Sequence, residues 1–289
     1  MEGKPDWLPD FPVQIYCNRG ELMYDQHIHS RYSQDGHHDI MEIAQAAVER
    51  GLRGITITDH FDLCDAEIGY RFYLDCEQQR RRAFEQAREA FDGRLEIRWG
   101  IEVGHPYFMP EVARAFLESH PFDFVLGAVH FLRGNRDIYL IDYSSPAVAD
   151  AVLKEYFTDM LELLRFGGFD SLAHLDYPLR VMRGKIPEPT VAGYRDYIDP
   201  ILQEVVRQGI SLEINTRGFM DWKKRQEPED WVLARYYELG GRRITIGSDA
   251  HVLDAVGGEI DRAIRKAREI GFTELMFYRE RKPCAISLL

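Results

Sequence analysis

Short apolar runs that alternate with helical patterns constrain the fold of this 289-residue chain more than any other feature. Most of the stretches between the runs have the pattern of helices. The seven runs lie near 22–29, 54–58, 95–102, 123–130, 170–174, 210–215 and 243–248. Such alternation favours a mostly parallel sheet, and seven units fall one short of the eight-stranded barrel. We therefore predict an α/β fold, a distorted (β/α)7 TIM-like barrel.

Several of the intervening stretches carry the signals of helix ends. Asp39 and Glu42 form a capping box ahead of an apolar stripe that continues to residue 50. End signals, apolar stripes or charged composition predict three more helices, at 73–92, 145–167 and 260–267. No internal repeat or low-complexity linker interrupts the pattern. We expect residues 1–289 to form a single domain.

The charge balance and the cysteines argue against several classes of protein. With 36 basic and 48 acidic side chains, the chain has a formal charge of −12, which repels a nucleic-acid backbone unless basic groups or metal ions reverse the sign locally. No apolar run approaches the length of a membrane span, and Met1 to Asp10 lack the order of a secretory signal. Four scattered cysteines, without a Cys-x-x-Cys pair, indicate neither a disulfide framework nor a thiolate zinc site. We expect a cytoplasmic protein that does not bind membranes and for which nucleic acid is a disfavoured partner.

Residues of the types that bind metal ions follow nearly every predicted strand. His27 and His29 end the first strand pattern, and side chains two positions apart on a strand share a face. Such a pair is common by chance, but the later runs end in the same way. They end at or just before Asp59, His60, Glu102, His130, His174, Asp176, Glu213, Asn215, Asp249 and His251. Because the C-terminal ends of barrel strands open onto one face, we predict a metal site there.

Other histidines and carboxylates are expected outside the group that contacts metal. His37 and His38 precede a helix, and His105 and His120, each followed by proline, belong to loops. The three nearby carboxylates are Asp25, Asp59 and Glu213. The two aspartates are expected to orient imidazoles by hydrogen bonds, and Glu213 to pair with an arginine at the barrel rim.

The order and spacing of these motifs resemble the PHP (polymerase and histidinol phosphatase) superfamily. The motifs are His27-x-His29, Ser33-x-Asp35-Gly36, Thr58-Asp59-His60, Gly100-Ile101-Glu102, Gly127-x-Val129-His130, Ala173-His174-Leu175-Asp176, Glu213-Ile214-Asn215-Thr216 and Gly247-Ser248-Asp249-Ala250-His251. Within the superfamily the pattern is similar to that of monofunctional histidinol-phosphate phosphatases. The likeness runs from about Tyr24 to Arg281-Lys282-Pro283.

The resemblance implies a trinuclear metal cluster. On the matching positions, the first ion would be held by His27, His29, Glu102 and Asp249. Glu102 would bridge to a second ion held by His130 and His174. The third would rest on Asp35, His60 and His251, although some family members have histidine where this chain has Asp35.

The ligand types agree with phosphoester chemistry. Mixed imidazole and carboxylate ligands suit Zn²⁺, Mn²⁺, Fe²⁺ or Co²⁺, so we expect two or three divalent ions. Ions bridged by one carboxylate lower the pKa of a shared water, and the resulting hydroxide would attack phosphorus in line. Glu102 and Asp249 are therefore expected to be catalytic residues. Asp176 is one candidate donor of the proton to the leaving alcohol.

The expected substrate is a small phosphorylated metabolite. A phosphate monoester calls for an arginine beside the metals, and Arg180, six residues after His174, matches an arginine of the histidinol-phosphatase pattern. The second arginine of that pattern is replaced here by Met220, with Arg217 three residues earlier as a possible substitute. Either arginine could instead form an ordinary surface ion pair. Glu213 and Asn215 are candidates to contact an amino group of the substrate.

Three functions are compatible with these residues. The leading one is hydrolysis of L-histidinol phosphate in histidine biosynthesis, as the resemblance implies. The second is a PHP phosphoesterase that acts on a nucleotide, a short oligonucleotide or another ester, which Met220 and Arg217 motivate. The third is a structural module without activity, which the intact set of costly polar residues disfavours. The residues carry no signal for the oligomeric state.

Overall fold

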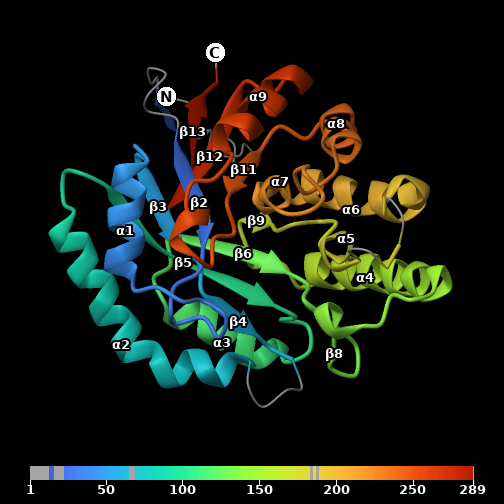
Figure 1. Ribbon diagram of the computed structural model, residues 1–289, viewed down its shortest axis with the longest axis horizontal. Coiled ribbons are helices and arrows are strands. Elements are labelled where there is room, and N and C mark those ends of the chain that lie inside the picture. Colours follow the sequence, from blue (N-terminus) through green and yellow to red (C-terminus); the bar gives the residue numbers. More distant parts are fainter. Residues whose placement is uncertain (1–12, 16–22, 65–68, 183–184, 187–188, 289) are drawn as a thin grey trace, which may run out of the picture.

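Seven parallel strands form the centre of the molecule in a computed structural model that describes residues 13–15, 23–64, 69–182, 185–186 and 189–288 (Figure 1). Their order in the sheet is β11-β10-β9-β6-β5-β3-β2, and a short strand, β4 (His60–Asp62), extends the pairing along β5. The seven are β2 (Tyr24–Ile28), β3 (Gly54–Ile57), β5 (Glu96–Gly104), β6 (Phe124–Ala128), β9 (Ser171–Leu172), β10 (Ser211–Asn215) and β11 (Ile244–Gly247). Each of the seven predicted runs coincides with one of these strands, although β5 extends beyond its run to Gly104. The predicted distorted (β/α)7 barrel is confirmed.

The barrel closes between its first strand and the chain that leaves its last one. His29 N donates to Ala250 O at 2.9 Å, and Asp249 N donates to His27 O at 2.8 Å. Gly247 permits this approach, because a Cβ atom there would lie 2.2 Å from the Cβ of His27. Closure therefore brings the two ends of the predicted site, which are more than two hundred residues apart in sequence, into direct contact.

Helices surround the strands, with α1 and α2 on one flank and α4 and α6 on the opposite one (Figure 1). The helices are α1 (Ile40–Glu49), α2 (Gly69–Ala90), α3 (Pro110–Ser119), α4 (Pro146–Phe166), α5 (Pro178–Val181), α6 (Arg195–Gln208), α7 (Arg217–Met220), α8 (Asp230–Glu238) and α9 (Ile260–Ile270). The capping box of Asp39 and Glu42 is present at α1, and Ser145 caps α4. The predicted charged helix begins earlier than expected, at Gly69. No described helix has the length and apolar content needed to span a bilayer.

A small sheet at the opposite end of the barrel was not predicted. It consists of β1 (Val13–Ile15) and the hairpin of β12 (Glu274–Arg279) and β13 (Lys282–Ser287), in the order β1-β13-β12. Tyr278 donates to the carbonyl of Asp170, at the start of β9, and packs with Phe124 at the start of β6. The hairpin thus covers the N-terminal end of the barrel and leaves the C-terminal end to the functional site.

Further short elements connect the strands near that end. They are β7 (Phe131–Leu132), β8 (Arg136–Asp137) and the 3-10 turns η1 (Ile138–Leu140), η2 (Ala192–Tyr194) and η3 (Leu253–Ala255). Strands β7 and β8 pair antiparallel, directly after the expected ligand His130. η1 follows them and carries Tyr139, which is 67% exposed at the rim of the barrel.

Candidate metal centre

The C-terminal ends of the strands gather all nine residues that the sequence nominated as metal ligands. They come from β2, β4, β5 and the loops after β2, β6, β9 and β11. All but three are buried; His60 and His251 are partly exposed, and the side chain of Asp35 is 53% exposed. The nine are His27, His29, Asp35, His60, Glu102, His130, His174, Asp249 and His251.

Four side-chain atoms surround one point beneath the rim. His27 Nε2 lies 3.0 Å from His29 Nε2, 3.3 Å from Glu102 Oε2 and 3.7 Å from Asp249 Oδ1. His29 Nε2 lies 3.5 Å from the same Glu102 oxygen and 3.4 Å from the same Asp249 oxygen. Ligands at 2.0–2.1 Å from a tetrahedral zinc ion are about 3.3 Å apart. Five of the six distances among these atoms, 3.0–3.7 Å, are therefore close to the spacing of a tetrahedral ligand set.

The other oxygen of Glu102 faces a second group. Glu102 Oε1 lies 2.9 Å from His174 Nε2 and 3.3 Å from His130 Nε2, and these two nitrogens are 3.4 Å apart. Three ligand atoms at such distances leave a coordination position open, as catalytic metal sites require. Because its two oxygens face different groups, Glu102 has the placement of a carboxylate that bridges two ions.

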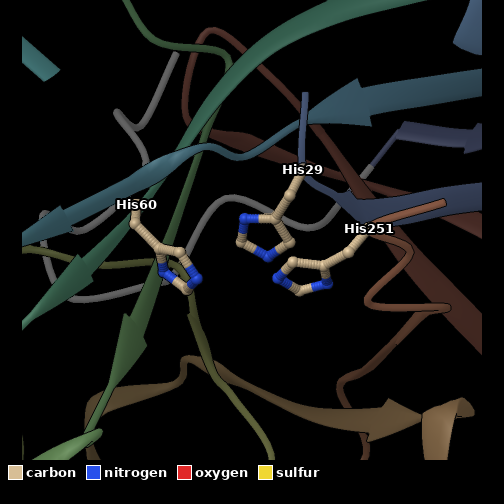
Figure 2. Close-up of side chains that lie close together, drawn as sticks. All are labelled: His29, His60 and His251. Carbon is tan, nitrogen blue, oxygen red and sulfur yellow. The ribbon is translucent and has the colours of Figure 1, made fainter. Parts of the chain in front are cut away.

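A third group lies nearest to solvent. The imidazoles of His29, His60 and His251 face one another in Figure 2, and their ligand atoms lie within 4.8 Å. Asp35 joins this group, with one oxygen 3.1 Å from His251 Nε2 and the other 3.6 Å from His60 Nε2. These contacts are looser and more exposed than those around Glu102.

Buried atoms without hydrogen bonds support the fit to metal ions. Among the described residues, Glu102 Oε2 and His60 Nδ1 have no hydrogen-bond partner, although they are only 2.9 Å apart. Leaving a buried polar atom unpaired costs about 1–3 kcal/mol. A charged oxygen and a ring nitrogen placed this way suit a shared cation.

The imidazoles of the cluster differ in the direction in which their surroundings shift the pKa. Burial, together with repulsion from His251 and His60, lowers the pKa of His29 to about 3, so its ring is neutral and has a lone pair for an ion. Burial also disfavours the charged form of His130, but Asp62 and Glu102 outweigh it and raise the pKa to about 9. An ion at His130 must therefore displace a proton, so metal affinity should rise with pH.

Carboxylates around the cluster orient its imidazoles. Glu213 Oε1 lies 2.7 Å from His27 Nδ1, and Asp62 Oδ1 lies 2.9 Å from His130 Nδ1. Such contacts fix the tautomer so that Nε2 faces the ion. Asp62 received no role in the sequence analysis, although its position two residues after His60 on a strand placed both on one face.

The two aspartates that were expected to orient imidazoles act less directly. Asp25 accepts from the backbone nitrogens of Ser248 and Gly257 and so secures the chain after β11. Asp59 accepts from Ser33 Oγ, which in turn lies 3.0 Å from His29 Nδ1. Neither carboxylate has a described hydrogen bond to an imidazole, so that expectation is corrected.

The four histidines expected outside the cluster do lie outside it. His37 and His38 belong to the loop before α1, and His120 follows α3. His105 is buried in the loop after β5, where its Nε2 accepts from the backbone nitrogens of His130 and Phe131. It therefore supports the loop that carries His130.

Arg180, on α5, lies between the cluster and a second buried carboxylate. Its Nη1 donates to Asp249 Oδ2 at 2.6 Å, and its Nη2 donates to Glu227 Oε2 at 2.6 Å. Its Nε and Nη2 make longer bonds, both 3.3 Å, to Glu227 Oε1 and Asn215 Oδ1. A guanidinium has five N–H donors, so these contacts leave one for a ligand.

Two adjoining cavities open over the cluster. The one above the histidines has a volume of about 440 Å³, and its neighbour has about 780 Å³. Tyr139, Tyr177 and Arg180 line both. Arg217 lines the larger cavity with Met220, and no described residue forms a hydrogen bond or ion pair with its guanidinium. The cation of Arg217 therefore faces the cavity, and none of the residues that the structure describes supplies a counter-ion to it.

Three other nominated residues have contacts that differ from their expected roles. Glu213 is buried between His27 and the backbone nitrogen of His174, and it pairs with no arginine among the described residues. Asn215 is buried and donates to Glu213 and Asp249. Asp176 is fully buried, and its Oδ2 accepts from Glu229 N. Burial raises its pKa to about 7, but these contacts do not place it in either cavity.

Comparison with known proteins agrees with the sequence motifs. The PHP domain profile matches residues 25–217. A probable histidinol-phosphatase of Clostridium acetobutylicum is 32% identical over 259 residues, which cover 89% of this chain and 97% of the relative. A probable histidinol-phosphatase of Thermotoga maritima is 30% identical and covers 88% of this chain and 94% of its own length.

A solved structure extends the likeness to three dimensions. Histidinol phosphate phosphatase of Lactococcus lactis, in complex with zinc, L-histidinol and phosphate, is 27% identical and superposes with a TM-score of 0.78. The match covers 90% of this chain and 98% of the other. A putative histidinol phosphatase of Listeria monocytogenes, 16% identical with a TM-score of 0.71, shares the fold over 83% of this chain and 99% of its own.

The fold and the site together define a class: a seven-stranded barrel with clusters able to bind several metal ions at its C-terminal face. Within that class the match to the PHP profile covers most of the chain. The chain belongs to the PHP domain family.

Proposed function

We propose that this protein hydrolyses L-histidinol phosphate to L-histidinol and phosphate in histidine biosynthesis. The observation that carries the proposal is the near full-length match to a phosphatase seen with zinc, L-histidinol and phosphate, combined with Arg180 beside the clustered ligands. The protein is a metal-dependent phosphatase, and residues 1–289 act as one PHP-type domain in the cytoplasm. The domain assignment is supported by ligand residues that extend from His27 to His251.

The proposed ligand sets follow the measured distances. His27, His29, Glu102 and Asp249 hold one ion, and Glu102 bridges to a second ion on His130 and His174. When bound, such ions supply positive charge for the phosphoryl oxygens and activate water as the nucleophile. Zinc is supported by the structure from L. lactis, and Mn²⁺, Fe²⁺ and Co²⁺ suit the same donor atoms.

The protein's own residues position the substrate. Arg180 offers its remaining N–H, and Arg217 offers a whole guanidinium, so together they can hold the phosphoryl group from two sides. Asn215 supports Arg180 and Asp249, and Glu213 orients His27. The contacts with the substrate's amino group that were expected for Asn215 and Glu213 stay predictions beside these roles.

The substrate is tested by a comparison of monoesters and a diester on the purified enzyme with measured metal content. We expect kcat/KM for L-histidinol phosphate to exceed the values for nucleotides and other monoesters, with little hydrolysis of the diester. Met220 stands where the histidinol-phosphatase pattern has its second arginine, so another phosphate ester is the alternative substrate. That alternative becomes the conclusion if a different monoester is the best substrate while L-histidinol phosphate is inert.

Asp35→Ala is expected to lower the bound metal by about one ion per chain. The carboxylate contacts only the outermost group of ligands, at His60 and His251, whereas the ligands around Glu102 do not depend on it. The side chain is 53% exposed, so its loss should affect folding little. Elemental analysis of metal-saturated protein measures the change. Asp35→His, which supplies another ligand type, should retain the ion. An unchanged ion count in Asp35→Ala would show that Asp35 is not needed to hold a third ion.

A further inference from the structure

A fully buried carboxylate, Glu227, holds the inner side of the Arg180 guanidinium. Its Oε2 accepts from Nη2 at 2.6 Å, and its Oε1 accepts from Nε at 3.3 Å. Two parallel contacts of this kind fix the plane of a guanidinium as well as its position. The opposite edge then faces Asp249 through Nη1. Glu227 therefore determines which N–H groups of Arg180 point toward the cluster.

Glu227 is itself fixed to the barrel. Its backbone nitrogen donates to Asn215 O at 3.0 Å, and Asn215 N donates to Glu227 O at 2.7 Å. Asn215 is the last residue of β10, so these two bonds join the segment after α7 to the end of a core strand. The Glu227 side chain is 0% exposed. A carboxylate anchored in this way can define a position, which a mobile surface carboxylate could not.

A second buried cation completes the arrangement. Lys223 Nζ lies 2.5 Å from Glu227 Oε1, and both side chains are 0% exposed. Burial raises the pKa of Glu227, but Arg180 and Lys223 outweigh it and lower the pKa to about 2. Glu227 is therefore shared between two cations. Arg180 in turn is shared between Glu227 and Asp249, so the charges alternate from Lys223 to the ligand cluster.

We propose that Glu227, paired with Lys223, is a positioning residue that orients Arg180 toward the phosphoryl group of the substrate. This role rests on the proposed phosphatase function, in which Arg180 contacts phosphate. Without Glu227, Asp249 and Asn215 would be the remaining hydrogen-bond partners of the guanidinium among the described residues, beside the ring of Tyr177 at 5.3 Å. Further rotamers of the long side chain would then become accessible. Misplacing a contact by about 1 Å can cost on the order of 10²-fold in rate.

The test is Glu227→Gln, which keeps the size of the side chain and removes its charge. We expect kcat/KM for p-nitrophenyl phosphate to fall roughly 10- to 100-fold, with a parallel rise in the inhibition constant of inorganic phosphate. Bound metal should stay at the wild-type level, because Glu227 contacts no member of the ligand set. Melting temperature and metal content, measured on the same sample, separate this effect from a general loss of structure.

Glu229→Gln is the matched control. Glu229 is 4% exposed and lies two residues further on, but its oxygens bind Thr190, Trp231 and Arg225 rather than Arg180. Its substitution should leave the phosphate inhibition constant within about threefold of the wild-type value, because its carboxylate contacts neither Arg180 nor the ligand cluster. An equal loss in both variants would overturn the positioning role.

A double-mutant cycle makes the test specific to Arg180. In an Arg180→Met background, Glu227→Gln should cause no further loss, because the group that it positions is gone. The same fold-loss in both backgrounds, or unchanged phosphate inhibition in Glu227→Gln, would overturn the proposal. These measurements use inorganic phosphate and an aryl ester. They therefore do not depend on which alcohol the natural substrate carries. Failure to hydrolyse L-histidinol phosphate would refute only the proposed substrate.

Discussion

Glu102→Gln is expected to reduce kcat/KM by on the order of 10³-fold or more, because catalysis that uses two ions depends on the group that bridges them. One oxygen of Glu102 lies 2.9–3.5 Å from nitrogens of His27, His29 and His60, and the other lies 2.9–3.3 Å from His174 and His130. The amide keeps one oxygen and loses the charge, so at least one ion should be lost per chain. Elemental analysis and steady-state kinetics on the same preparation measure both effects.

Glu96→Gln is the control on the same strand. Glu96 begins β5 at the other end of the barrel, where it pairs with Arg98 and Arg279. The variant should keep full metal content and wild-type kinetics. If Glu102→Gln also retained its metal and activity, the assignment of Glu102 as the bridging carboxylate would be wrong.

Arg217→Met is expected to lower kcat/KM for a phosphate monoester by roughly 10- to 100-fold, since a hydrogen bond to a charged group contributes about 1.5–3 kcal/mol. Arg180 can supply only one free N–H, because Glu227, Asn215 and Asp249 engage the others. The guanidinium of Arg217 has no such partners among the described residues and faces the larger cavity. The loss should appear in the inhibition constant for inorganic phosphate as well as in kcat/KM.

Lys224→Met removes the same charge from a neighbouring position. Lys224 is exposed, does not line the cavity, and donates to Met220 O at 3.4 Å. A small effect of this variant beside a large effect of Arg217→Met would assign the loss to a direct contact rather than to the overall charge. Equal effects would leave Arg217 without a specific role in phosphate binding.

Local patterns were sufficient for the barrel itself. Each core strand lies in a short apolar or alternating run, and helix ends such as the capping box of Asp39 and Glu42 depend only on neighbours in sequence. The terminal hairpin was missed for the opposite reason. Its residues pack on the starts of strands β6 and β9, which are more than one hundred positions away in sequence. Local hydrophobic periodicity does not predict a contact over such a separation.

Some residues of the candidate site could be predicted from local sequence patterns, and others could not. His27, Glu102 and Asp249 could be nominated because a strand end in a parallel barrel has a known location, whatever the rest of the chain does. Glu227 follows no predicted strand, so no local pattern placed it near Arg180. Its position depends on backbone pairing with Asn215 and on burial beside Lys223.

The sequence by itself therefore determined the barrel, the gathering of metal-ligand residue types at one end, and the resemblance to PHP phosphatases. Only the tertiary structure decided which contacts each of those residues makes within the site. It turned one oxygen of Glu102 toward each of two groups of imidazoles and turned Glu213 toward His27. Among the described residues, it left one free donor on Arg180 and no partner for the guanidinium of Arg217. The physical reason is that residue type and spacing fix which groups meet, whereas the hydrogen bonds of a buried side chain depend on every neighbour packed around it.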